Sequence, residues 1–207
     1  MMEMLLDLTD FLVCYIVVAT IVNMVMMGML CIRFSHASIR ECYLITADNR
    51  IDIQAGVRCA GFASAFVLRH FGIDVSGNEL YNAMPSKKPD GTVYPKGIQR
   101  LLAQHGFKVK YCAGNLNALK NALCKGDPVI AFIHVRPNKK ELHFVPVVGF
   151  DADHIYLAES LQELANCREQ LYNRKVSSEE FKRLWNTIGL KMPLYKNTYL
   201  TVSRKKQ

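Results

Sequence analysis

The sequence predicts an α+β domain preceded by an N-terminal transmembrane helix. Three observations support this fold class. Residues 11–32 carry no charged side chain, apolar helical segments follow them, and short strand-like segments fill much of the C-terminal half. Helices followed by strands that are neighbours in the chain are typical of an α+β domain and not of a doubly wound parallel sheet. The 207 residues suffice for one such domain with an appendage.

The uncharged run FLVCYIVVATIVNMVMMGMLCI, residues 11–32, predicts the membrane span. As a helix rising ~1.5 Å per residue it would be about 33 Å long, close to the ~30 Å hydrocarbon core of a bilayer. A buried core helix of this length usually shows a polar stripe, whereas Thr20 and Asn23 are the only clearly polar residues here. A cleaved signal peptide would need a basic segment before the run and a small-x-small cleavage site, and the sequence has neither.

The charges that flank the run predict its orientation. Acidic residues precede it, and Arg33 and Arg40 follow it. By the positive-inside rule the C-terminal part lies in the cytoplasm. We therefore expect a single-pass protein of the cell membrane, with residues 1–34 as tail and anchor, residues 35–50 as a connector and residues 51–207 as the domain.

Helices are expected in the first half of the domain. A long apolar stretch begins at Cys59 and ends at Gly72, a residue that suits a helix C-terminus. This stretch is apolar nearly all round, which predicts a central buried helix. Shorter helices are expected over residues 78–84, 96–105 and 117–124.

Strands are expected in the second half, over residues 129–134, 142–150 and 154–157, with a last strand over 195–202. The turn at residues 151–153 joins two of them as a hairpin. Ser177 and Glu180 form a capping-box pattern that opens a helix ending at Trp185.

Charge and cysteine content exclude several classes of protein. The net charge is +8, and it is confined to residues 59–207, which carry +10, whereas residues 1–58 carry −2. No zinc-finger spacing, recognition-helix pattern or aromatic-interleaved basic stripe accompanies these charges, so we expect no nucleic-acid partner. The seven cysteines are scattered, with no CxxC pair and no nearby His at ligand spacing. We therefore expect reduced thiols, no metal and no other cofactor.

Four residues form a candidate site for thiol chemistry. Cys59 stands at a predicted helix N-terminus, where free N–H groups and the helix dipole stabilise a thiolate. Gln54 is close enough in sequence to donate to a developing oxyanion beside the Cys59 N–H. His143 begins an apolar strand and could act as the base, and Glu159 follows the next strand and could orient that imidazole. Each residue alone also fits an ordinary structural role: a buried thiol, a turn residue, a core histidine and a strand-end charge.

The segments around these residues resemble a known family. QAGVRCAGFASAFVLRHFG from Gln54 to Gly72, HFVPVVGFD from His143, and the strand ending at Glu159 closely resemble the bacteriocin-leader (double-glycine) peptidase family, C39-like cysteine peptidases of papain-like fold. The resemblance spans about residues 51–161, and the helix with Trp185 is also similar. It implies a central helix packed on an antiparallel sheet, and peptide-bond hydrolysis through an acyl-enzyme. In this scheme Cys59 is the nucleophile, His143 the base, Gln54 the oxyanion donor and Glu159 the orienting carboxylate.

Two departures from the family pattern leave alternatives open. Ala60-Gly61 stands where members usually have Gly-Pro, and Glu159 stands where they usually have Asp. The chain could therefore be a catalytically degenerate peptide-binding domain, or a papain-fold amidase or transferase. The resemblance implies a peptide or protein substrate. It also raises the option of a partner transporter, because leader peptidases are commonly fused to one.

Overall fold

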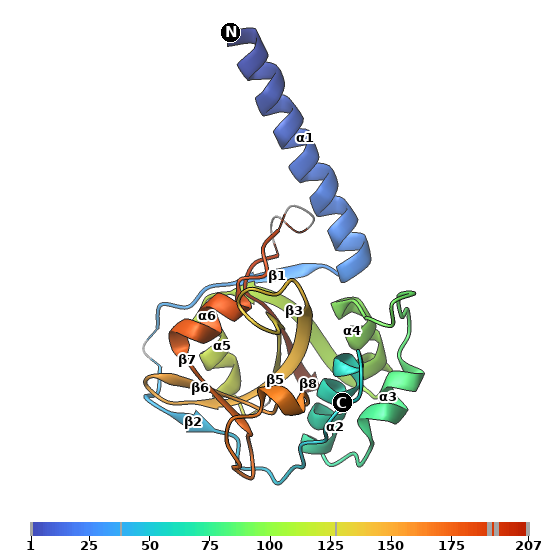
Figure 1. Cartoon of the computed structure of the whole chain (residues 1–207), viewed down its shortest axis with the longest axis vertical. Helices are drawn as coiled ribbons and strands as arrows, with labels where there is room; N and C mark the ends of the chain where they lie inside the picture. The colour runs from blue at the N-terminus through green and yellow to red at the C-terminus, as the bar shows by residue number, and fades with distance from the viewer. Residues whose placement is uncertain (1, 38, 127, 190–191, 193–194, 206–207) are drawn as a thin grey trace.

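The computed structural model describes residues 2–37, 39–126, 128–189, 192 and 195–205, which form an α+β domain with one projecting helix. Helix α1 (Met2–Met27) extends away from the domain, as Figure 1 shows. The described strands form a single eight-stranded sheet in the order β1-β3-β8-β4-β5-β6-β7, with β2 paired to β5. Every pairing is antiparallel except that of β1 with β3. The strands are β1 (Leu30–Arg33), β2 (Tyr43–Leu44), β3 (Phe107–Gly114), β4 (Val129–His134), β5 (Leu142–Phe150), β6 (His154–Leu157), β7 (Arg174–Ser177) and β8 (Thr198–Arg204).

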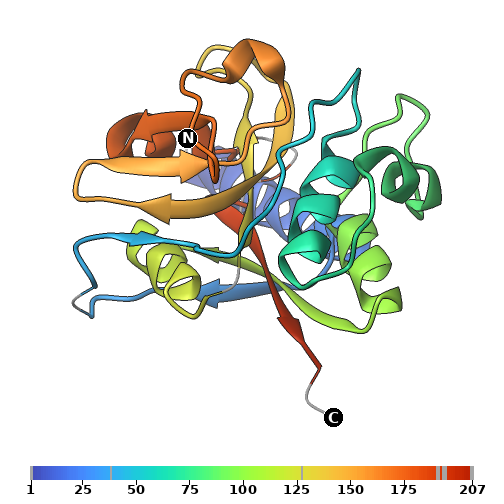
Figure 2. The same cartoon turned by 90° about the horizontal axis from the view of Figure 1, so that it is seen from below.

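The remaining helices lie on two sides of the sheet. Seen from below in Figure 2, α2, α3 and α4 gather on one side of the domain, and the strongly curved sheet with α5 and α6 forms the other. The bounds are α2 (Cys59–His70), α3 (Gly77–Ala83), α4 (Pro95–Gln104), α5 (Leu116–Leu123), α6 (Ser178–Trp185) and a short 3-10 helix, η1 (Gln162–Leu164).

Helix α2 is the central buried helix that the sequence predicts. It begins at Cys59, and every residue from 60 to 68 is buried. It packs against β5 and against α3. The contact with α3 is close because each helix has a glycine at the crossing: a Cβ at Gly61 would collide with the backbone of Gly77, and a Cβ at Gly77 would collide with the ring of Phe62. The helix ends before Gly72, whose φ of +85° is the left-handed conformation that glycine adopts readily.

Most of the predicted elements are confirmed. β4, β5 and β6 have the predicted bounds, and α3, α4 and α5 each begin and end one residue earlier than expected. The side chain of Ser177 caps α6 by accepting from the N–H of Glu180 at 3.1 Å. The last strand begins at Thr198 and not at Tyr195, because Asn197 adopts a positive φ of 53° and Tyr195 packs into the core instead.

The sequence predicted one helix over the uncharged N-terminal run, residues 11–32, and this prediction is wrong at its C-terminal end. α1 ends at Met27, Gly28 has a φ of +104°, and β1 pairs in parallel with β3. The end of the run is therefore part of the sheet, and so is β2, which lies in the expected connector. The segment Leu8–Met27 has 20 residues and a mean hydropathy of 2.1, which makes it long and apolar enough to cross a membrane. The division into residues 1–34, 35–50 and 51–207 is otherwise still a prediction.

Candidate active site

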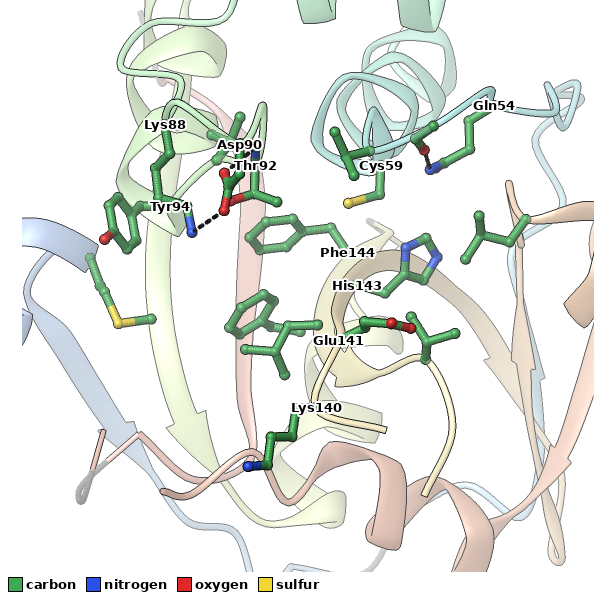
Figure 3. A pocket seen from close by; sticks show the side chains of 18 of the residues that line it. Gln54, Cys59, Lys88, Asp90, Thr92, Tyr94, Lys140, Glu141, His143 and Phe144 are labelled. Carbon is green, nitrogen blue, oxygen red and sulfur yellow. Dashed lines mark hydrogen bonds and ion pairs between the residues drawn. The ribbon is translucent and has the colours of Figure 1, made fainter. Parts of the chain in front are cut away.

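A pocket of about 520 Å³ lies where the N-terminus of α2 faces strand β5. Cys59, Gln54 and His143 all line it. In Figure 3, Cys59 descends from the helix and His143 rises from the strand, so that the thiol and the imidazole point toward each other. Two residues that are 84 positions apart in the sequence thus line one pocket, where each shifts the pKa of the other.

The far side of the His143 ring contacts Glu159. Nε2 of His143 lies 2.7 Å from Oε1 of Glu159, and the side chains of both residues are almost completely buried. Because Nε2 is engaged by the carboxylate, the other ring nitrogen, Nδ1, is the one available to the thiol. The hairpin of β5 and β6 produces this geometry, since His143 enters β5 and Glu159 lies just beyond the end of β6.

Arg174 and its neighbours fix the Glu159 carboxylate. Nη1 of Arg174 donates to Oε2 of Glu159 at 2.8 Å, and the backbone N–H of Leu161 donates to Oε1 at 2.9 Å. The side-chain amide of Asn173 holds the backbone of Glu159 from both sides, at 2.7 and 2.8 Å. A buried carboxylate is tolerated only when it is paired and hydrogen-bonded, and here both oxygens have charged partners.

The three groups shift one another's ionisation. Burial opposes the charge on Cys59, but the hydrogen bond and the charge of His143, with the N–H groups of Phe144 and Ala60, lower the pKa of the thiol below its ordinary value. Burial likewise disfavours imidazolium, but the Glu159 carboxylate and the Cys59 thiol together raise the pKa of His143. Burial would raise the pKa of Glu159, and His143, the Leu161 N–H and Arg174 lower it instead. The arrangement therefore favours a thiolate–imidazolium pair next to a carboxylate.

Gln54 borders the pocket in a fixed position. Its Oε1 accepts from the hydroxyl of Ser160 at 2.7 Å, its backbone N–H donates to the carbonyl of Ser160, and its Nε2 donates to the carbonyl of Gly56 at 2.6 Å. The amide nitrogen carries two hydrogens, so the bond to Gly56 leaves one for a substrate oxygen. Ser160 directly follows Glu159, and Gln54 is thereby coupled to the loop that supplies the carboxylate.

Comparison with known protein families gives a match over the part of the chain that contains the site. A model of the Peptidase C39-like family matches residues 47–191, which include Cys59, His143 and Glu159. The chain belongs to this family. No curated protein matches the sequence. Helix α1 lies outside the part of the chain that the family model matches.

Solved structures with the same fold include other C39-like peptidases. One, described as a C39-like peptidase from Bacillus anthracis, is 16% identical, has a TM-score of 0.59, and aligns over 79% of this chain and 98% of its own. A double-glycine-motif protease from an AMS/PCAT transporter, solved with a leader peptide, is 18% identical, with a TM-score of 0.54 over 77% and 94% of the two chains. A Carica candamarcensis cysteine protease solved with E-64 is 14% identical, with a TM-score of 0.57 over 81% and 100%. The predicted papain-like α+β fold is confirmed.

Two charged residues near these segments in the sequence have other partners. Asp151 accepts from the backbone N–H groups of Asp153 and His154 and from the hydroxyl of Tyr156, so it holds the β5–β6 turn and does not contact His143. Arg58 precedes Cys59 but donates to the side chain of Asn78 at 2.7 Å. Arg58 therefore contributes to α2–α3 packing. Among the described residues, no group of three or more His, Cys, Asp or Glu side chains is placed to hold a metal ion.

Arg174 is the site residue that the sequence did not reveal. It begins β7, a four-residue strand with no distinctive pattern, and meets Glu159 only because β7 pairs with β6. The one local signal is that an arginine and an asparagine stand directly before a short alternating segment. That pattern is too common to have indicated a buried ion pair.

Proposed function

We propose that this C39-like protein is a membrane-anchored cysteine peptidase with Cys59 as nucleophile, His143 as general base and acid, and Glu159 as the orienting group. The observation that carries the proposal is the chain from the half-buried Cys59 thiol to the buried imidazole and carboxylate, with His143 and Glu159 2.7 Å apart. A nucleophile in contact with a base that is itself held by a third group is the arrangement that thiol hydrolases require.

The reaction follows from this geometry. The Cys59 thiolate attacks the carbonyl carbon of the scissile peptide, and the resulting oxyanion accepts from the Cys59 N–H and from Gln54. His143 then donates its proton to the departing amine as the C–N bond breaks, leaving a thioester on Cys59. Water attacks that thioester while His143 accepts a proton, and the thiolate is released with the carboxylic acid product. Glu159 holds the imidazole in one tautomer and orientation throughout.

Membrane anchoring through α1 belongs to the same proposal. The segment Leu8–Met27 is long enough to span a bilayer, and the arginines after it favour a cytoplasmic domain. Contacts at the end of α1 support a retained anchor and not a cleaved signal sequence. Met27 is 2% exposed in the domain core, and Nζ of Lys96 donates to the carbonyl of Val25 at 2.8 Å. Cleavage there would remove a core side chain.

A substrate screen tests the proposed function. The full-length protein, purified in detergent micelles, is incubated with a proteome-derived peptide library and, separately, with cell-wall peptide fragments, and new termini are mapped by mass spectrometry. We expect peptide cleavage that the Cys59→Ala variant lacks. Products from the cell-wall fragments alone would favour the amidase or transferase alternative, and no Cys59-dependent product from either pool would contradict the proposal.

Thiol alkylation as a function of pH separates an active site from a degenerate one. Because His143 lowers the pKa of Cys59, the thiol should be alkylated by iodoacetamide at pH 7 about tenfold faster than the exposed Cys42. In His143→Ala the effect of burial, which raises a thiol pKa, is opposed only by the N–H groups of Phe144 and Ala60, so half-maximal alkylation of Cys59 should move to higher pH than in the parent. Mass spectrometry of tryptic peptides gives both rates. A Cys59 that reacts no faster than Cys42 in the parent protein would favour the peptide-binding pseudoenzyme.

Gln54→Ala tests the oxyanion donor. Loss of one such donor typically lowers kcat by about 10²–10³. We expect that loss together with a melting temperature near that of the parent, because Gln54 is half-buried in a loop. Gln54→Glu is the matched variant: it retains an acceptor for Ser160 but has no N–H to donate, so it should be as slow as Gln54→Ala. Parental activity in both variants would remove Gln54 from the mechanism.

A further inference from the structure

We infer that the cleft takes peptide segments that lie next to a membrane span, so that the substrate is itself anchored in the bilayer a few residues from the scissile bond. The inference rests on the proposed function and concerns the substrate class of that site. It starts from the lining of the cleft, because α1 contributes Asn23 and Met27 to the same pocket that holds Cys59. In Figure 3 a blue ribbon from the N-terminal part of the chain borders the pocket on the left.

The two faces of α1 differ near its C-terminal end. Asn23 is 7% exposed and Met27 is 2% exposed, whereas Val22 and Val25 are 53% and 61% exposed. One face of the last turns is thus fixed against the catalytic domain while the other presents apolar side chains outward. A polar residue in a span normally faces protein or water and not lipid, and Asn23 satisfies this rule by lining the cleft.

The end of the span places the cleft at the bilayer boundary. The segment Leu8–Met27 matches the ~30 Å hydrocarbon core, so Met27 lies where the hydrocarbon ends. The ammonium of Lys96 donates to the carbonyl of Val25, close to this end of the span. Lysine side chains near the end of a span typically place their charge among the lipid headgroups. Because Met27 lines the cleft, one end of the cleft lies at this boundary.

Exposed apolar side chains follow the span directly. Met29, Ile32 and Phe34 are 79%, 70% and 69% exposed, although they lie in and around a strand of the folded domain. β1 crosses the end of the domain from which α1 projects (Figure 1). Large exposed apolar side chains beside a membrane anchor are suited to contact the lipid interface, which would hold this end of the domain against the bilayer.

The chemistry of the cleft fits a juxtamembrane peptide. Val93, Phe132, Phe144 and Met27 give it an apolar lining, and the rings of Phe132 and Phe144 are stacked at 4.5 Å. Such a surface accepts apolar and aromatic side chains, and aromatic residues are enriched at the membrane interface. Confining enzyme and substrate to one membrane also raises their effective concentration, an effect that reaches ~10²-fold or more for linked partners.

Matched membrane substrates test the inference. The peptide that is cut fastest in the library is fused to an unrelated transmembrane helix, with the scissile bond 4 or 24 residues from the span, and reconstituted with the full-length protein in vesicles. Four extended residues reach about 13 Å, so only a cleft at the membrane surface can cut the short fusion. We expect the short fusion to be cut at least as fast as the long one, and both about tenfold faster than the free peptide at equal amounts. Cleavage of the long fusion alone would overturn the inference.

A second measurement requires no turnover. In a variant in which the other six cysteines are replaced by Ser or Ala, a bimane label on Cys59 should be quenched by lipids that carry a nitroxide on the headgroup. The control is Thr46→Cys in a Cys59→Ala version of that variant, which labels the segment after β2, at the opposite end of the domain from α1 (Figure 1). Equal quenching at the two positions would overturn the inference. If no peptide is cleaved but Cys59 alone is quenched, the proposed peptidase function fails and the membrane position of the cleft stands.

Discussion

Cys59→Ala and His143→Ala are each expected to reduce kcat/KM by about 10⁵–10⁶, to the level left by substrate binding and the oxyanion donors alone. The two groups act as one unit, because His143 is the largest influence that lowers the pKa of the Cys59 thiol. Losses within such a unit are not additive, so the double variant should be no slower than either single one. Initial rates on the best library peptide, measured over a range of enzyme concentrations, give these values.

Two controls keep that result interpretable. Cys42→Ser removes an exposed thiol and should leave kcat/KM unchanged. Circular dichroism and the melting temperature establish that each variant is folded, which matters for His143→Ala because that change leaves Glu159 buried with Arg174 as its main partner. A folded His143→Ala protein with more than about 1% of parental activity would mean that another group is the base.

Glu159→Gln is expected to reduce kcat by about 10³–10⁴ through loss of the orienting charge. The amide is nearly the same size, but it removes the negative charge that holds His143 as an imidazolium and fixes its tautomer. The pKa of His143 should fall, and the alkaline limb of the kcat/KM profile should therefore move to lower pH. The change also leaves Arg174 buried without a carboxylate, which typically destabilises a protein by about 3–5 kcal/mol.

Three related variants separate orientation from stability. Arg174→Met removes the charge that balances Glu159, so it should destabilise the fold while slowing catalysis less than Glu159→Gln. Glu159→Asp withdraws the carboxylate by one methylene, and since Glu159 now bridges partners at 2.7 and 2.8 Å on its two oxygens, we expect an intermediate rate. Asp151→Asn is the matched control: it alters the β5–β6 turn and should leave kcat unchanged. A loss for Asp151→Asn equal to that for Glu159→Gln would make Asp151 the orienting group.

Local patterns in the sequence were sufficient for much of the fold. A long continuous apolar run predicts a fully buried helix, because each of its side chains is stabilised by removal from water. α2 follows such a run, and residues 60–68 are all buried. β4 and β5 were predicted with their bounds for the same reason, since strands buried on both faces have nearly uninterrupted apolar sequences. β6 alternates buried and half-buried residues, and it was predicted from the turn at residues 151–153. Cys59, Gln54, His143 and Glu159 stood out at the ends of such elements, which is where side chains leave the core and can meet in a cleft.

Only the tertiary structure decided which of those residues meet, and where the anchor ends. The partner of Glu159 is set by the pairing of β6 with β7, which brings Arg174 to its carboxylate although no local sequence signal marks that contact. The uncharged run reads as one helix to residue 32, but Leu30 and Cys31 lose contact with water equally well in a membrane or against the domain core. Hydropathy measures the burial of a side chain and not what buries it, so the choice between lipid and sheet required the parallel pairing with β3.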